Sequence, residues 1–204
     1  GSLEDYLDRQ GPLPVQEAVE MATDLAIGLV HAHSKGVFHC DLKPANVLLD
    51  MDDKPRLADF GQSRLSHEQT PALGTLFYMA PEQAEGLEVT FAADIYAFGV
   101  IWFELLTTKK PGVGTLKIQK HRPDCPSAWE EIIGQCLDSE PEDRPGLSRI
   151  KQVLEAEAFA SDIDDKEEEE RKQKEEEECR KKEAEARRKK ADAETGGTDT
   201  GRRT

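Results

Sequence analysis

The sequence has few of the features that mark several large protein classes. Its four cysteines (Cys40, Cys125, Cys136 and Cys179) form no CxxC pair, which argues against a zinc site or a disulfide scaffold and fits a reducing compartment. The longest apolar stretch, 95–103, is too short to span a bilayer, and the start shows no secretory pattern. We therefore expect a cytoplasmic protein with no membrane partner, although sequence upstream of these residues would alter that expectation.

Basic charge is scarce relative to acidic charge. The 204 residues include 42 acidic and 27 basic side chains, giving a formal net charge of −15. No basic patch dominates the body, which argues against a nucleic-acid partner. The acidic balance is compatible with basic protein substrates, although acidic surfaces commonly serve only solubility.

The charge is distributed unevenly along the chain. Residues 161–204 contain 29 charged and only six apolar residues among 44, so this part cannot build a core. Residues 1–160 have an ordinary globular composition. The composition thus predicts a folded domain at 1–160, a Glu/Lys/Arg-rich segment at 161–194 and a disordered tail at 195–204.

The segment 161–194 carries many acid-to-base pairs four residues apart, such as Glu167–Arg171, in the direction that stabilises a helix. It has no apolar a/d seam, which argues against a coiled coil. A solvated single helix and a helix-prone disordered linker both remain open, and we favour a spacer role for either.

The folded part is predicted to be mainly α-helical. Apolar periodicity and stop signals indicate helices at 3–9, from Pro14 to the stop at Lys35-Gly36, and at 91–106, 129–137 and 147–159. The helix at 91–106 is apolar on nearly all sides, which is typical of a central core helix. Short strand-like runs lie at 37–39, 47–49 and 56–58.

One polar loop carries the residue types that phosphoryl transfer requires. His39-Cys40-Asp41-Leu42-Lys43-Pro44-Ala45-Asn46 places an acid, a cation and an amide within six positions, and Asp59-Phe60-Gly61 follows. A carboxylate can accept a hydroxyl proton, a cation can neutralise phosphate charge, and oxygen ligands can hold Mg²⁺. The ordered pair HxDLKxxN and DFG is specific because its spacing is matched as well.

With these motifs the sequence resembles the eukaryotic-type protein kinases. The resemblance continues through Ala80-Pro81-Glu82, through Asp94 at the start of DIYAFGV, and through Arg144 in PEDRP. It covers about residues 1–157. The resemblance implies a protein-kinase-like C-lobe, which is a helical bundle with short β-hairpins at the catalytic loop, here without a small lobe and followed by the charged helix.

The resemblance also implies roles for individual residues, with ATP and Mg²⁺ as cofactors. Asp41 would be the catalytic base and Lys43 would contact the transferring phosphate. Asn46 and Asp59 would ligate Mg²⁺, and Leu48 would lie under adenine. The remaining implied roles are structural: His39 and Phe60 stacking in the core beside Gly61, Asp94 holding the loop backbone, and a buried Glu82–Arg144 pair bracing the substrate segment.

Two features of the resemblance imply transfer to serine or threonine. Asp41-Leu42-Lys43-Pro44 is the Ser/Thr form of the loop, and Thr75 resembles the threonine that bonds the base and the lysine. The end of the lobe is similar to the tyrosine-kinase-like group. Cys40 replaces the usual arginine, so the chain resembles non-RD kinases, and we expect phosphorylation of Ser66 or Thr70 not to be a strong on-switch. Cys40 is either a simple replacement, which we favour, or a redox-sensitive thiol.

Besides Cys40, the sequence departs from the family pattern in a second way, which concerns the elements that cover ATP in the family. No GxGxxG precedes Asp41, so the glycine-rich loop, the strand lysine and most of the hinge are expected to be missing from this chain, together with efficient ATP binding. Two hypotheses follow. The chain is a fragment of an ATP-dependent Ser/Thr protein kinase, or it is a pseudokinase-like scaffold. Retention of Asp41, Lys43, Asn46 and Asp59 favours the first.

Overall fold

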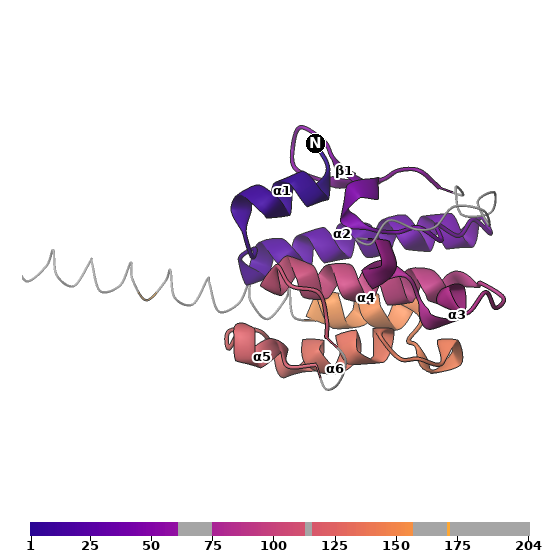
Figure 1. Cartoon of the computed structure of the whole chain (residues 1–204). Coiled ribbons are helices and arrows are strands. Elements are labelled where there is room, and N and C mark those ends of the chain that lie inside the picture. The colour runs from indigo at the N-terminus through magenta and orange to yellow at the C-terminus, as the bar shows by residue number, and fades with distance from the viewer. Residues whose placement is uncertain (61–74, 113–115, 157–170, 172–204) are drawn as a thin grey trace, which may run out of the picture. The chain divides into compact units, whose positions relative to one another are not determined.

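The computed structural model describes residues 1–60, 75–112, 116–156 and 171. The chain divides into two compact units, Gly1–Phe159 and Ala160–Thr204, and the description below concerns the first. Its described part is mainly helical with one small sheet (Figure 1), as the sequence predicts. The segment 161–194 (apart from Arg171) and the tail 195–204 lie outside the described residues, so their structure and the domain limits stay predictions.

Six labelled α-helices and three 3₁₀ turns make up most of the described fold. The helices are α1 (Leu3–Gln10), α2 (Val15–Ser34), α3 (Pro81–Ala84), α4 (Phe91–Thr107), α5 (Ile118–His121) and α6 (Ser127–Cys136), and residues 147–156 are also helical. The 3₁₀ turns are η1 (Pro44–Asn46), η3 (Thr75–Tyr78) and η4 (Pro141–Asp143). No helix in these ranges is long and apolar enough to cross a membrane.

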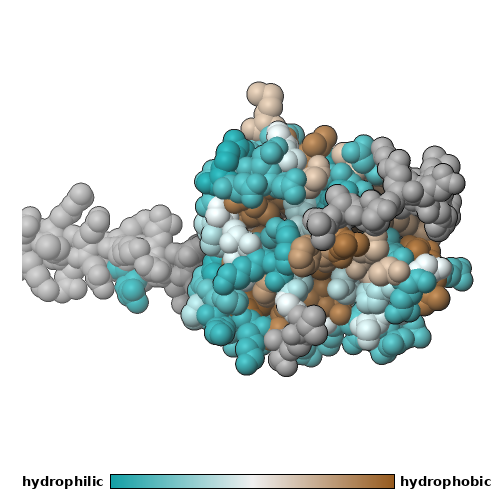
Figure 2. All heavy atoms as spheres, in the orientation of Figure 1, coloured by the Kyte–Doolittle hydropathy of each residue, from teal (hydrophilic) through white to brown (hydrophobic). Residues whose placement is uncertain are grey.

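Helix α4 is the centre of the core, as its all-round apolar sequence predicts. It lies between α2 and α6 (Figure 1), and all of its residues except Phe91 and Tyr96 are buried. Trp102 packs against Phe98 and Trp129, with ring centroids 5.8 and 5.6 Å away. Hydrophobic residues also reach the surface at the level of α4, across the middle of the face shown in Figure 2.

A glycine allows α4 and α6 to pack closely. A Cβ atom added at Gly99 would lie 2.7 Å from the Cβ of Cys136, which is far inside van der Waals contact. Cys136 is fully buried in this interface, so neither side chain can turn away to relieve a clash. The crossing therefore depends on the missing side chain at Gly99.

Strands β1 (Val47–Leu49) and β2 (Pro55–Leu57) form an antiparallel hairpin with Val47 opposite Leu57. Helix α1 is tied to it, because the Leu49 amide donates to the Gly1 carbonyl at 2.8 Å. Ser2 caps α1 with a reciprocal capping box to Asp5. The hairpin follows the polar loop directly, so its position sets where that loop ends.

The strand predicted at 37–39 is wrong, and the described residues contain one hairpin rather than several. Backbone groups of this run are bonded elsewhere: the Val37 amide donates to the Ala32 carbonyl at the end of α2, and the His39 amide donates to the Asp94 carboxylate. A side-chain acceptor on α4 thus replaces the partner strand that the apolar pattern implied.

Candidate active site

Asp41 lies at the centre of a compact polar cluster in the loop. Lys43 Nζ donates to its Oδ2 at 2.9 Å and to its Oδ1 at 3.2 Å. Asn46 Nδ2 donates to the Asp41 backbone carbonyl at 2.8 Å and to its Oδ2 at 3.0 Å. Pro44 begins η1 and fixes the short turn that brings Asn46 back toward Asp41. The acid, the cation and the amide noted in the sequence are therefore in direct contact.

The backbone of the loop is held from below by Asp94 in the first turn of α4. Its fully buried carboxylate accepts from the His39 amide at 2.8 Å and from the Cys40 amide at 2.7 Å. His33 Nε2 lies 2.8 Å from the same carboxylate. Cys40 adopts a positive φ of 59°, a conformation that non-glycine residues rarely adopt unless neighbouring contacts impose it. Asp94 supplies those contacts.

Asp59 is brought beside the loop by backbone and ring contacts. The Ala58 amide donates to the Asn46 carbonyl at 2.9 Å, and His39 Nε2 donates to the Ala58 carbonyl at 2.8 Å. The rings of His39 and Phe60 pack with centroids 4.7 Å apart. Phe60 is 38% exposed, whereas His39 is fully buried. The expected ring contact exists, but Phe60 lies at the edge of the core instead of inside it.

The structure describes only some of the other predicted site residues. Leu48, on β1, is 48% exposed, so its side chain is accessible to a ligand. Gly61, Ser66 and Thr70 lie outside the described residues, and only the backbone of Thr75 is described, within η3. The structure therefore leaves their predicted roles as predictions.

Glu82 and Arg144 form a bidentate ion pair, 62 residues apart in sequence. Arg144 Nη1 lies 2.6 Å from Glu82 Oε1, and Nη2 lies 2.7 Å from Oε2. The guanidinium also donates to the backbone carbonyls of Ala92, Asp138 and Ser139. The Arg144 side chain has no exposed surface. This enclosed pair joins α3 to the segment around η4.

The pKa of Glu82 reflects this environment. Burial alone would raise it, but hydrogen bonds from Arg144 and from the backbone, together with the positive charge of the guanidinium, hold it below the ordinary value. Glu82 therefore stays ionised and paired at neutral pH.

A second cluster, which the sequence did not reveal, holds Tyr78, at the other end of the short segment that runs from Tyr78 to Glu82. Tyr78 Oη donates to Glu104 Oε2 at 2.5 Å, and Lys110 Nζ donates to both Glu104 and Tyr78. Burial, followed by the bond to Glu104, raises the pKa of Tyr78. A carboxylate inside the apolar helix α4 was the available signal, because such a group needs a partner.

The donor set fits the chemistry of Mg²⁺, which takes oxygen ligands, commonly one or two carboxylates plus substrate phosphates. Asn46 donates through its nitrogen to Asp41, so its amide oxygen is the atom left for a cation. Asp59 is exposed and directly follows Ala58, whose amide bonds the Asn46 carbonyl. Among the described residues no group of three or more His, Cys, Asp or Glu side chains could form a complete protein cage for a metal.

Comparison with known families gives one match over most of the chain. The profile described as "Protein kinase domain" matches residues 1–159. The chain belongs to the protein kinase family. The match spans the loop of Asp41 as well as both anchors of the segment from Tyr78 to Glu82.

Curated relatives of this kinase chain include serine/threonine kinases from distant organisms. A probable LIM domain-containing serine/threonine-protein kinase of Dictyostelium discoideum is 36% identical over 169 residues, covering 76% of this chain and 26% of the relative. The serine/threonine/tyrosine-protein kinase HT1 of Arabidopsis thaliana is 34% identical over 172 residues, covering 76% and 44%. The serine/threonine-protein kinase PknH of Mycobacterium tuberculosis is 36% identical over 162 residues, covering 70% and 26%. The chain thus spans less than half of each of these relatives.

Proposed function

We propose that this chain provides the catalytic loop of an ATP-dependent serine/threonine protein kinase. The observation that most directly supports this proposal is the contact of Asp41 with both Lys43 and Asn46. The hydrogen bond between Ala58 and Asn46 brings the backbone that carries Asp59 to the same loop. A scaffold would need none of these groups in this arrangement. The tyrosine-kinase-like subgroup, the non-RD character and the cytoplasmic location remain proposals based on the sequence.

The proposed reaction transfers the γ-phosphoryl group of ATP to a Ser or Thr hydroxyl. The hydroxyl oxygen attacks the γ-phosphorus, the bond to the bridging oxygen breaks, and ADP leaves with that electron pair. Asp41 accepts the hydroxyl proton, and Lys43 offsets negative charge on the transferring group. Mg²⁺, held by Asn46 and Asp59, would neutralise phosphate charge when bound.

Rigid support of Asp41 is the part of the mechanism that this chain supplies most clearly. The carboxylate is oriented by Lys43 and Asn46, and the backbone before it is held by Asp94. Positioning of this kind contributes to catalysis, because a small displacement of the base increases the distance over which the hydroxyl proton must move. Leu48 would offer an apolar contact to adenine, and Thr75 would bond the base and the lysine.

The test is phosphoryl transfer from γ-labelled ATP to a Ser/Thr peptide by the whole protein that carries this sequence. Asp41→Asn should lower the rate by about 10²–10⁴-fold, because the base is lost while the shape is kept. Asp59→Asn should abolish the stabilisation by Mg-ATP in thermal unfolding. Asp8→Asn removes the same charge from an exposed position on α1 and should change neither.

The scaffold alternative predicts a different pattern. Transfer by the unaltered protein would not exceed that of Asp41→Asn, and Mg-ATP would not shift its unfolding temperature. That result would overturn the kinase proposal and leave a pseudokinase-like interaction module.

A further inference from the structure

Positive charge is concentrated in one stretch of this acidic lobe. Residues 105–123 contain four lysines, one arginine and one histidine, and no aspartate or glutamate. Over residues 1–160 acidic side chains outnumber basic ones 26 to 14. The stretch runs from the end of α4 through α5, well separated along the chain from the loop of Asp41.

The fold gathers the four lysines around one open pocket. Helix α4 ends at Thr107, and the left-handed conformation of Thr108 turns the chain so that Lys109 and Lys110 face α5. The pocket has a volume of about 240 Å³. Its lining includes Phe103, Lys109, Lys110, Lys117, Lys120 and His121.

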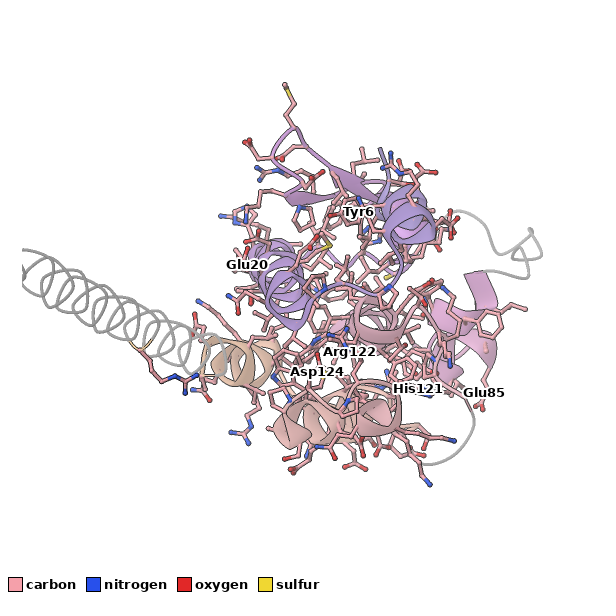
Figure 3. The ribbon with its side chains drawn as sticks, turned by 90° about the vertical axis from the view of Figure 1, so that its left-hand side faces the viewer. Tyr6, Glu20, Glu85, His121, Arg122 and Asp124 are labelled. Atoms are coloured by element: carbon pink, nitrogen blue, oxygen red, sulfur yellow. The ribbon has the colours of Figure 1, made fainter. Side chains whose placement is uncertain are left out.

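Most of these cations have no carboxylate of their own. Lys110 is paired with Glu104. Among the described residues Lys109, Lys117 and Lys120 form no ion pair with an acidic side chain, and all three are exposed. Lys109 Nζ instead lies 3.3 Å from Nδ1 of His121 (labelled in Figure 3). Neighbouring positive groups without counter-charge create a local potential that attracts anions.

Arg122 does not contribute to this potential in the same way. Its guanidinium pairs with Asp124 (Figure 3) and donates to the carbonyls of Leu13 and Leu106. It therefore holds the end of α5 against the end of α4. The pocket offers lysine point charges above an apolar floor at Phe103 and the half-buried Leu116. The residues that the structure describes in its lining include no arginine fork, the group that favours bidentate phosphate binding.

We propose that this pocket, which we name the lysine pocket, binds an acidic segment of a partner protein. Several separated lysines match the spaced carboxylates of a Glu/Asp-rich peptide, and the apolar floor accepts one of its non-polar side chains. The net negative charge of the rest of the lobe disfavours an extended anionic surface such as a membrane, because repulsion acts wherever the lobe approaches it. The binding itself does not depend on catalytic activity.

The lysine pocket is connected to the segment proposed to hold the substrate. Lys110 lines the pocket and also bonds Tyr78 in η3. A bound acidic segment would therefore lie one side chain away from η3. This connection, unlike the binding, rests on the proposed function.

The experiment measures binding of a fluorescein-labelled peptide of alternating glutamate and alanine residues by anisotropy, using the full chain. The double variant Lys117→Gln/Lys120→Gln should weaken binding by about tenfold or more, and added salt should weaken binding to the unaltered chain. The matched control Lys35→Gln/Lys54→Gln removes the same charge outside the pocket and should change the Kd by less than about twofold. Circular dichroism checks that both variants are folded.

Three results would overturn the proposal. The first is equal binding of the glutamate peptide to the pocket variant and the unaltered chain, or no binding up to about 1 mM. The second is equal binding of a glutamine-for-glutamate peptide. The third is pocket-dependent binding of inorganic phosphate or of phosphatidylserine vesicles that exceeds peptide binding, since that would identify a phosphate or lipid site. Peptide binding that only the pocket variant loses supports the proposal.

Discussion

The segment from Tyr78 to Glu82 is anchored at its two ends by clusters of opposite design. At Glu82 the partner is Arg144, which has no exposed surface and uses its planar fork on one carboxylate and three backbone carbonyls. At Tyr78 the partners are Glu104 and Lys110, and the Lys110 side chain is 31% exposed. The Glu82–Arg144 end, which we call the closed anchor, is enclosed and fully bonded. The end formed by Tyr78, Glu104 and Lys110, which we call the open anchor, borders the lysine pocket.

The largest expected effect comes from breaking the closed anchor. Arg144→Ala should destabilise the lobe by about 3–5 kcal/mol, because it leaves Glu82 buried without its counter-charge. Urea unfolding followed by circular dichroism measures this. Lys151→Ala, which breaks the exposed pair with Glu155, is the control and should cost less than about 0.5 kcal/mol. Similar losses in the two variants would show that the closed anchor is not special.

A smaller effect is expected at the open anchor. Glu104→Gln keeps the shape but removes the charge that Lys110 and Tyr78 share, and it should cost about 1–3 kcal/mol. The side chain of Lys110 can turn toward water, which limits the loss. The same unfolding assay measures it. A cost equal to that of Arg144→Ala would contradict the distinction between a closed and an open anchor.

The smallest effect is a difference in pH dependence. The folded-state pKa of Glu82 lies below 4.5, so its contribution is present above about pH 4.5 and is lost as the pH falls through the folded-state pKa. The folded-state pKa of Tyr78 lies above 10.0, so its contribution is present below about pH 10 and is lost as the pH rises toward the folded-state pKa. The closed anchor should thus weaken in acid and the open one in alkali.

Stability measured against pH tests this directly. Glu82→Gln should flatten the acid side of the profile, and Tyr78→Phe should flatten part of the alkaline side. Some alkaline loss should persist in Tyr78→Phe, because the bond to Glu17 and burial raise the pKa of Tyr6 to about 12. An unchanged alkaline slope in Tyr78→Phe would remove Tyr78 from the account.

Motif spacing was sufficient to predict the family, and the all-round apolar sequence of 91–106 predicted the core helix. The structure brings Asp41, Lys43 and Asn46 together. Such short spacings fix proximity within one loop. The carboxylate of Glu104 in an apolar helix indicated that it needs a partner, but which residues supply it could not be predicted, because 26 residues separate Tyr78 from Glu104 and nothing in the pattern links them.

A long-range contact accounts for the difference at 37–39. The strand expected at 37–39 failed because Asp94, 55 residues from His39, accepts the amide that a strand partner would bond. The net charge suggested basic substrates, which stays a prediction, whereas the acidic segment that we propose for the lysine pocket is argued from where the lysines of 105–123 meet. A net charge says nothing about where the charges meet.

Gly99 also constrains how sequences related to this one can drift. The Cβ of Cys136 occupies the space that any side chain at Gly99 would need, so a gain of volume at position 99 requires a loss at position 136 or a shift of α6. The two positions cannot vary independently, although 37 positions separate them in the sequence. Compensating substitutions at both positions would preserve the spacing of α4 and α6, whereas a side chain gained at position 99 alone would require α6 to move.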